Sequence, residues 1–214
     1  DGTRGLFDST LNRPAVQAAC LAVLLLAAGL RIVSTYRVFN HTIDEASHIE
    51  GGIEWWQKGT YTLEAKHTPL ARISVALGPY LAGARWTNPR SWTEAAPVLS
   101  ANGSYWRNLT LGRMGVLPYF VIATLVVFFW TRRLLGAPAG LIAAAVFTQL
   151  PTVLTHSSVA TTDLPLTAML CWALYAFTRW LEQPSPKTGA LFGVASGLAL
   201  ATKYPGRVRT LVAH

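Results

Sequence analysis

Two adjacent carboxylates, Asp44 and Glu45, are the side chains whose type is best suited to chemistry. A carboxylate can take a proton from a hydroxyl as a general base, or it can bind a cation. Two of them side by side at a membrane interface repel each other and lose hydration, which costs free energy. The structural alternative is an acidic first helical turn, where carboxylates meet the positive end of the helix dipole. The residues alone leave both hypotheses open.

A third carboxylate, Asp163, is isolated, because no other Asp or Glu occurs between Glu94 and Glu182. It follows two threonines and precedes an apolar run. It can therefore cap a helix, or it can contribute to a site shared with Asp44.

Two cations stand at the ends of apolar stretches, Arg113 before one and Lys203 after another. Basic residues at a membrane interface commonly extend their stems along lipid and keep the charge in water. The functional hypothesis is that both bind a phosphate at the level of the lipid headgroups.

Histidines add candidate metal ligands. Asp44 and His48, like His41 and Glu45, lie four residues apart, so each pair would share a helix face. Such spacings could hold a divalent metal. The candidate ligands are Asp44, Glu45, His48 and His156. No HExxH or paired-cysteine pattern is present, so ordinary polar loop histidines are the alternative.

The composition places these residues in a membrane protein. Of 214 residues, 51% are hydrophobic and 13% are charged, about half the charged share of a soluble domain. The net charge of +8 comes from basic residues scattered between uncharged stretches, which argues against a nucleic-acid binder with its concentrated basic patch. Cys20 and Cys171 lie in apolar stretches and are interpreted as small buried hydrophobes.

Five uncharged windows predict transmembrane helices: 14–30, 114–131, 134–162, 164–178 and 188–202. The last two are short, and flanking basic residues would complete them by snorkelling. The first could be a signal peptide, but no clear small-residue cleavage site follows it, so a retained span is predicted. The expected organisation is a cytoplasmic segment 1–13, a first span 14–36, an outer loop 37–113, four spans within 114–203, and a truncated tail 204–214.

Two helices are expected to lie in the interface within the long outer loop, near 44–57 and 69–82. Ile49, Ile53 and Trp56 form one apolar face of the first, and Thr68-Pro69 is typical of the start of the second. The predicted fold class is therefore all-α, a multi-pass transmembrane bundle with two interfacial helices in its first outer loop.

The short basic loops predict the orientation. Basic residues before the first span, between the second and third, and between the fourth and fifth all fall on one side, which the positive-inside rule makes cytoplasmic. The loop 155–165 and Lys203 then face the same outer side as the long loop. The predicted topology thus brings Asp44, Glu45, His156 and Asp163 to one membrane surface with Lys203.

Three segments resemble the C-type membrane glycosyltransferases, which include the protein O-mannosyltransferases and the lipid A aminoarabinose transferases. DEASHIEGGIEWWQKGTYTLEAKHTPLARI (44–73) is similar to their first outer loop, PTVLTHSSVATTDLPLTAML (151–170) to their loop between the third and fourth spans, and GLALATKYPG (197–206) to the span that follows. Lys66-His67-Thr68-Pro69 departs from the two prolines common in that family. Arg207 and Arg209 interrupt the apolar run expected next, so the chain is interpreted as an N-terminal fragment.

The resemblance implies an inverting transfer of a hexosyl or pentosyl group from a polyprenyl-phosphate carrier to a hydroxyl of a protein, lipid or glycan acceptor. It implies Asp44 as the general base with Glu45 beside it, and Asp163 as a second outer carboxylate. The substrate-binding residues would be His48, His67, Arg113, His156 and Lys203. A divalent metal is an open cofactor. The expected location is the plasma (inner) membrane, with a cytoplasmic N-terminus and the active site on the outer or periplasmic face.

Two other hypotheses compete with this one. A transporter or flippase of lipid-linked sugars would need polar residues or broken helices near mid-membrane. A membrane scaffold without chemistry predicts that Asp44, Asp163 and Lys203 lie apart.

Overall fold

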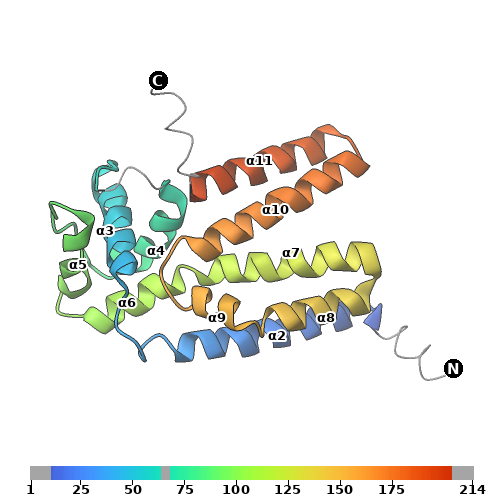
Figure 1. The fold of residues 1–214 in the computed structure, drawn as a ribbon, viewed down its shortest axis with the longest axis horizontal. Helices are drawn as coiled ribbons and strands as arrows, with labels where there is room; N and C mark the ends of the chain where they lie inside the picture. The colour runs from blue at the N-terminus through green and yellow to red at the C-terminus, as the bar shows by residue number, and fades with distance from the viewer. Residues whose placement is uncertain (1–10, 64–67, 204–214) are drawn as a thin grey trace.

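The computed structural model describes residues 11–63 and 68–203, and every regular element within them is a helix (Figure 1). In chain order the elements are α2 (Pro14–Ser34), α3 (Ile43–Lys58), α4 (Pro69–Leu81), the 3₁₀ turn η1 (Trp92–Glu94), α5 (Pro97–Ser100), α6 (Tyr105–Met114), α7 (Leu117–Leu135), α8 (Ala137–Phe147), α9 (Pro151–Ser157), α10 (Asp163–Glu182) and α11 (Pro186–Thr202). The all-α class expected from the sequence is confirmed.

Two helical stretches in the described residues are long and apolar enough to cross a membrane: Pro14–Ser34 and Tyr105–Leu135, the latter formed by α6 and α7. The pair α8 and α9 also qualifies if it is counted as one span, bent by 64° at its break. Leu26 and Leu30 on α2 are 67% and 72% exposed, as lipid-facing side chains of a membrane helix would be. Neither α10 nor α11 meets the same criterion, so the count of five spans stays a prediction.

The long helices α2, α7, α10 and α11 run side by side, and α3, α4 and α5 gather at one end of them (Figure 1). Residues that start α10 and end α11 lie at this end, whereas the turn between α10 and α11 lies at the other. Arg133 Nε donates a hydrogen bond of 2.8 Å to Glu182 at that opposite end. The turn between α10 and α11 thus lies at the opposite end of the long helices from α3, α4 and α5 (Figure 1).

Helix α3 is fixed by its caps and by close contact with α4. Thr42 and Glu45 form a capping box at its start, and Gly59 ends it in the left-handed conformation, with φ of 65°. Gly52 lets α4 approach closely, because a Cβ there would lie 2.2 Å from the carbonyl oxygen of Arg72. Helix α4 begins at Pro69, the residue at which the sequence predicts a helix start.

The sequence and the structure differ at the end of the outer loop. The loop was expected to run to Arg113, but helix α6 already begins at Tyr105. Two glycines, one in α6 and one directly after it, explain this packing: a Cβ at Gly112 would lie 2.5 Å from Ile49, and one at Gly115 would lie 2.5 Å from the carbonyl oxygen of Ser74. Helix α6 therefore packs against α3 and α4, and Arg113 lies inside the fold.

Candidate active site

A small pocket of about 120 Å³ lies where α3, α10 and α11 meet. Its lining brings together residues far apart in the sequence: Asp44, His48, Trp92, Thr161, Thr162, Asp163 and Lys203. The three charged residues that the scaffold hypothesis separates therefore line one pocket. The predicted topology brings the same three together.

Asp163 and Lys203 form an ion pair within this pocket. Lys203 Nζ donates a hydrogen bond of 2.8 Å to Asp163 Oδ1, and His156 Nδ1 lies 3.8 Å from Asp163 Oδ2. The hydrogen bond from Lys203 lowers the pKa of Asp163, which precedes the predicted span 164–178. An ammonium has three donors, and this bond to Asp163 uses one of them. Lys203, which is 30% exposed, can therefore also bind an anion that enters the pocket.

Asp44 and Glu45 have opposite surroundings although they are neighbours. Asp44 is exposed and lines the pocket. Its carboxylate accepts no hydrogen bond from the part of the chain that the structure describes, since the bond recorded there goes to its backbone carbonyl. Glu45 is fully buried. Asp44 is thus the carboxylate of the pair that a substrate can reach.

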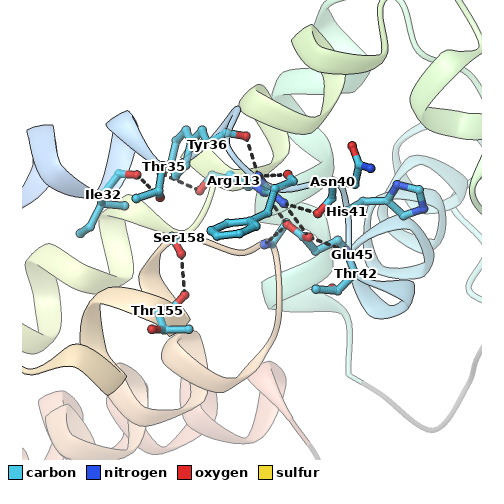
Figure 2. A network of polar contacts seen from close by, with 12 residues as sticks. Ile32, Thr35, Tyr36, Asn40, His41, Thr42, Glu45, Arg113, Thr155 and Ser158 are labelled. Carbon is cyan, nitrogen blue, oxygen red and sulfur yellow. Dashed lines mark hydrogen bonds and ion pairs between the residues drawn. The ribbon is translucent and has the colours of Figure 1, made fainter.

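Arg113 is saturated by its surroundings (Figure 2). A guanidinium has five N–H donors. Two of them hold Glu45, from Nε to Oε1 at 2.8 Å and from Nη2 to Oε2 at 3.0 Å. The other three hold the carbonyl oxygens of Tyr36, Phe39 and Asn40, at 2.5, 3.1 and 3.2 Å. No donor of Arg113 remains for a phosphate in this arrangement.

Glu45 is saturated in the same way. Its two oxygens provide about four acceptor positions. Besides the two bonds from Arg113, Oε1 accepts a bond of 2.9 Å from the Ala160 amide, and Oε2 accepts one of 2.8 Å from the Thr42 amide. The Glu45–Arg113 pair therefore joins α3, α6, the segment after α2 and the loop before α10. We call this pair the clamp.

His48 is a buried member of the pocket lining, only 5% exposed. Its Nδ1 accepts a hydrogen bond of 3.1 Å from Arg72 Nε. Because an arginine always keeps its protons, Nδ1 carries none, and the neutral imidazole holds its proton on Nε2. Arg72, a fully buried residue of α4, thereby sets the tautomer of His48.

Two further carboxylates of α3 hold the segments that follow α3 and α4. Glu50 accepts hydrogen bonds from the Thr87 amide, at 2.7 Å, and from its hydroxyl, at 3.0 Å. Burial raises the pKa of Glu50 to about 7, against these hydrogen bonds. Glu54 accepts bonds from the amide and the hydroxyl of Thr62, among others. These bonds outweigh the effect of burial, so the pKa of Glu54 is lowered.

No role is predicted from the sequence for Trp92, Thr161, Arg72, Glu50 or Glu54. The adjacent glycines of α3 were the available signal, because such a pair marks the close approach of another element. A helix covered on several sides buries its polar residues as well as its apolar ones.

The candidate metal ligands do not form a metal site in the described residues, where no three His, Cys, Asp or Glu side chains are grouped to hold an ion. Glu45 is engaged by Arg113, and His156 lies beside Asp163. The predicted binding residue His67 and the predicted tail 204–214 fall outside the described residues, as does most of the segment 1–13.

Two larger cavities flank the clamp and the pocket. One of about 380 Å³ lies between the end of α2 and α9, and it has Arg113, Thr155 and Ser158 in its lining (Figure 2). The other, of about 580 Å³, is lined mainly by apolar residues of α4, α7, α10 and α11, with Leu77, Trp172 and Leu198 among them.

One of the comparisons with known proteins gives a match. A model of the dolichyl-phosphate-mannose-protein mannosyltransferase family matches residues 112–212, slightly less than half of the chain. The matched range contains Asp163 and Lys203 but not Asp44. No match was found among curated proteins or among solved structures. The family match supports the resemblance of this chain to the C-type membrane glycosyltransferases.

Proposed function

We propose that this protein transfers a sugar from a polyprenyl-phosphate carrier to an acceptor hydroxyl, and that Asp44 is the general base. The observation that carries the proposal is the pocket itself, in which the accessible carboxylate of Asp44 shares one lining with the Asp163–Lys203 pair. The name of the matched family, dolichyl-phosphate-mannose-protein mannosyltransferase, supports a carrier of this chemical class.

The proposed reaction is a single displacement. The acceptor oxygen attacks the anomeric carbon, a bond forms between them, and the bond from that carbon to the phosphate oxygen breaks. The phosphate leaves with the electron pair, and attack from the opposite face inverts the configuration. Asp44 takes the hydroxyl proton, so its carboxylate must be free of other partners. Lys203 stabilises the charge that develops on the phosphate.

The clamp has a different role in this proposal. Because Arg113 and Glu45 satisfy each other and the surrounding backbone, we assign them to positioning rather than to substrate binding. They hold the start of α3, which carries Asp44, against the loop that precedes Asp163. His48, oriented by Arg72, and His156, beside Asp163, complete the proposed surroundings of the substrate. His67 stays a predicted substrate-binding residue.

The proposed location follows from the topology. The end of the bundle that holds α3 and α4 would face the outer or periplasmic side of the plasma membrane, opposite the basic loops and the cytoplasmic N-terminus. The apolar cavity of about 580 Å³ is suited to the hydrocarbon chain of the carrier, since α11 lines it through Leu198 and is followed by Lys203. The acceptor is a hydroxyl of a protein, lipid or glycan.

Asp44→Asn tests the proposal. The amide keeps the shape of the side chain but cannot take the proton, so we expect sugar transfer in reconstituted membranes to fall by 10²-fold or more, on the order of a general-base contribution. Glu182→Gln, a change to a half-exposed carboxylate at the opposite end of the bundle, is the control and retains transfer. Transfer retained by Asp44→Asn contradicts the assignment of the base. Repeating both measurements with a chelator determines whether a divalent metal takes part.

One observation favours the alternative of a transporter or flippase for lipid-linked sugars. Helices α8 and α9 form a broken pair, bent by 64°, and broken helices are typical of transport sites. That hypothesis predicts that Asp44→Asn leaves the movement of a labelled polyprenyl-phosphate sugar between leaflets unchanged, and that no acceptor becomes glycosylated.

A further inference from the structure

Trp92, Thr161 and Thr162 line the pocket but have no part in the proposed displacement, and the first two differ from Thr162 in ways that suggest a role. Trp92 belongs to the 3₁₀ turn η1 and is 38% exposed. Thr161 lies in the loop before α10. Both line the same pocket as Asp44, Asp163 and Lys203.

The fold fixes the segment that carries Trp92 on both sides. Before it, Thr87 donates two hydrogen bonds to the buried carboxylate of Glu50. After it, Val98 and Leu99 are fully buried in the core around α3 and α6. The segment that carries Trp92 is therefore held on both sides by contacts inside the protein.

The hydroxyl of Thr161 is an unsatisfied polar group. Its oxygen is buried and has no hydrogen-bond partner in the described part of the chain. Leaving such a group unpaired costs about 1–3 kcal/mol, and native structures rarely tolerate it without a reason. Because Thr161 lines the pocket, rotation about its Cα–Cβ bond would turn the hydroxyl toward a ligand there, and a ligand hydroxyl would then provide the missing partner.

From these two observations we infer that Trp92 and Thr161 form the subsite for the sugar ring of the donor. This inference rests on the proposed function, because the sugar is bonded to the phosphate that Lys203 holds and must lie close to it. One face of a sugar ring presents C–H groups, which carry partial positive charge and pack against the negative face of an aromatic ring. The hydroxyls at the edge of the sugar are polar, and one of them pairs with Thr161.

Other tryptophans show that exposure alone does not define this subsite. Trp106 is also 38% exposed, but it lies on α6 and lines none of the three cavities described above. Its ring packs against that of Tyr105, with centroids 5.1 Å apart. Trp106 is therefore the matched control for Trp92.

The test measures how much the sugar contributes to binding. Dissociation constants are determined in nanodiscs for two probes, polyprenyl phosphate and polyprenyl-phosphate mannose, and their ratio isolates the sugar. We expect Trp92→Leu to lower this ratio by roughly 3- to 10-fold, the size of one aromatic packing interaction. Thr161→Val, which removes the hydroxyl and keeps the shape, lowers it by a similar factor of about 5-fold. Trp92→Phe keeps an aromatic ring and retains most of the ratio, and Trp106→Leu leaves it unchanged.

The outcomes separate the two proposals. If the ratio is the same in the wild type, Trp92→Leu and Thr161→Val, the sugar subsite is overturned while the phosphate site stands. If the wild type binds both probes equally, the subsite is likewise overturned. If the wild type binds neither probe, the proposed function itself fails.

Discussion

Glu45→Gln distinguishes a structural clamp from a catalytic carboxylate. Each oxygen of Glu45 accepts two hydrogen bonds. In glutamine one of these oxygens becomes an NH₂ group, so whichever way the amide is turned, two N–H donors face another donor. The change therefore removes two hydrogen bonds and leaves the guanidinium of Arg113, which is 2% exposed, without its counter-charge.

The expected loss of stability follows from these contacts. A hydrogen bond to a charged group contributes about 1.5–3 kcal/mol, and two are lost. Removing one partner of a buried ion pair costs about 3–5 kcal/mol, which is the same range. We therefore expect Glu45→Gln to lower the free energy of unfolding by about 3–5 kcal/mol. Denaturant unfolding in detergent, followed by circular dichroism, measures this quantity.

Asp44→Asn is the matched control, because it makes the same chemical change one residue earlier. The Asp44 carboxylate is exposed and accepts no hydrogen bond from the described residues. The free energy of unfolding of Asp44→Asn should therefore differ from that of the wild type by less than about 0.5 kcal/mol. The proposal thus predicts opposite phenotypes: Asp44→Asn folds normally and loses transfer, whereas Glu45→Gln is destabilised. Equal stability of the two variants would refute the reasoning, and so would a stable Glu45→Gln that has lost transfer.

Two further predictions concern packing and pH. Gly52→Ala should destabilise the protein by about 1–3 kcal/mol or more, because the added Cβ would lie 2.2 Å from the Arg72 carbonyl oxygen. Gly29→Ala is the control, because a Cβ added there would have no atom within 4 Å and should not destabilise the protein. The denaturant midpoints of the two variants are compared, and equal midpoints would contradict the close contact at Gly52. The pKa of Glu50 is raised from 4.5 to about 7 by burial, so between these values the folded state binds more protons than the unfolded state, and stability falls as pH rises. Relative to Glu50→Gln, the wild type should therefore lose stability between about pH 5 and pH 7, and unfolding curves with no such divergence would argue against a buried, protonated Glu50.

The sequence predicts well what depends on local patterns. The helix near 44–57 is observed as Ile43–Lys58, and the helix expected from Pro69 begins there. Caps and starting prolines act within a few residues, so they can be read directly from the chain. The grouping of Asp44, Asp163 and Lys203 was also predicted, because it depends only on topology.

The sequence could not separate Asp44 from Glu45. Neighbouring helical residues point about 100° apart, and which direction is buried depends on partners far along the chain. Those partners are Arg113 and the amide of Ala160. The contacts of Arg113 with backbone carbonyls cannot be predicted from residue types, because every residue has a backbone carbonyl. For the same reason the loop that carries Trp92 showed no pattern, since its position depends on a hydrogen bond between Thr87 and Glu50.

The two members of the pocket's ion pair stand at the open ends of a single hairpin. Asp163 is the first residue of α10, and Lys203 directly follows α11. The hairpin closes at residues 183–185, about 30 Å away by the length of a 20-residue helix. Adding or removing one residue in either arm would rotate the charged end by about 100° and shift it by about 1.5 Å along the axis, which separates the pair. The number of residues in α10 and in α11 must therefore stay constant for the ion pair to form, whereas the turn at residues 183–185 is free to vary in length.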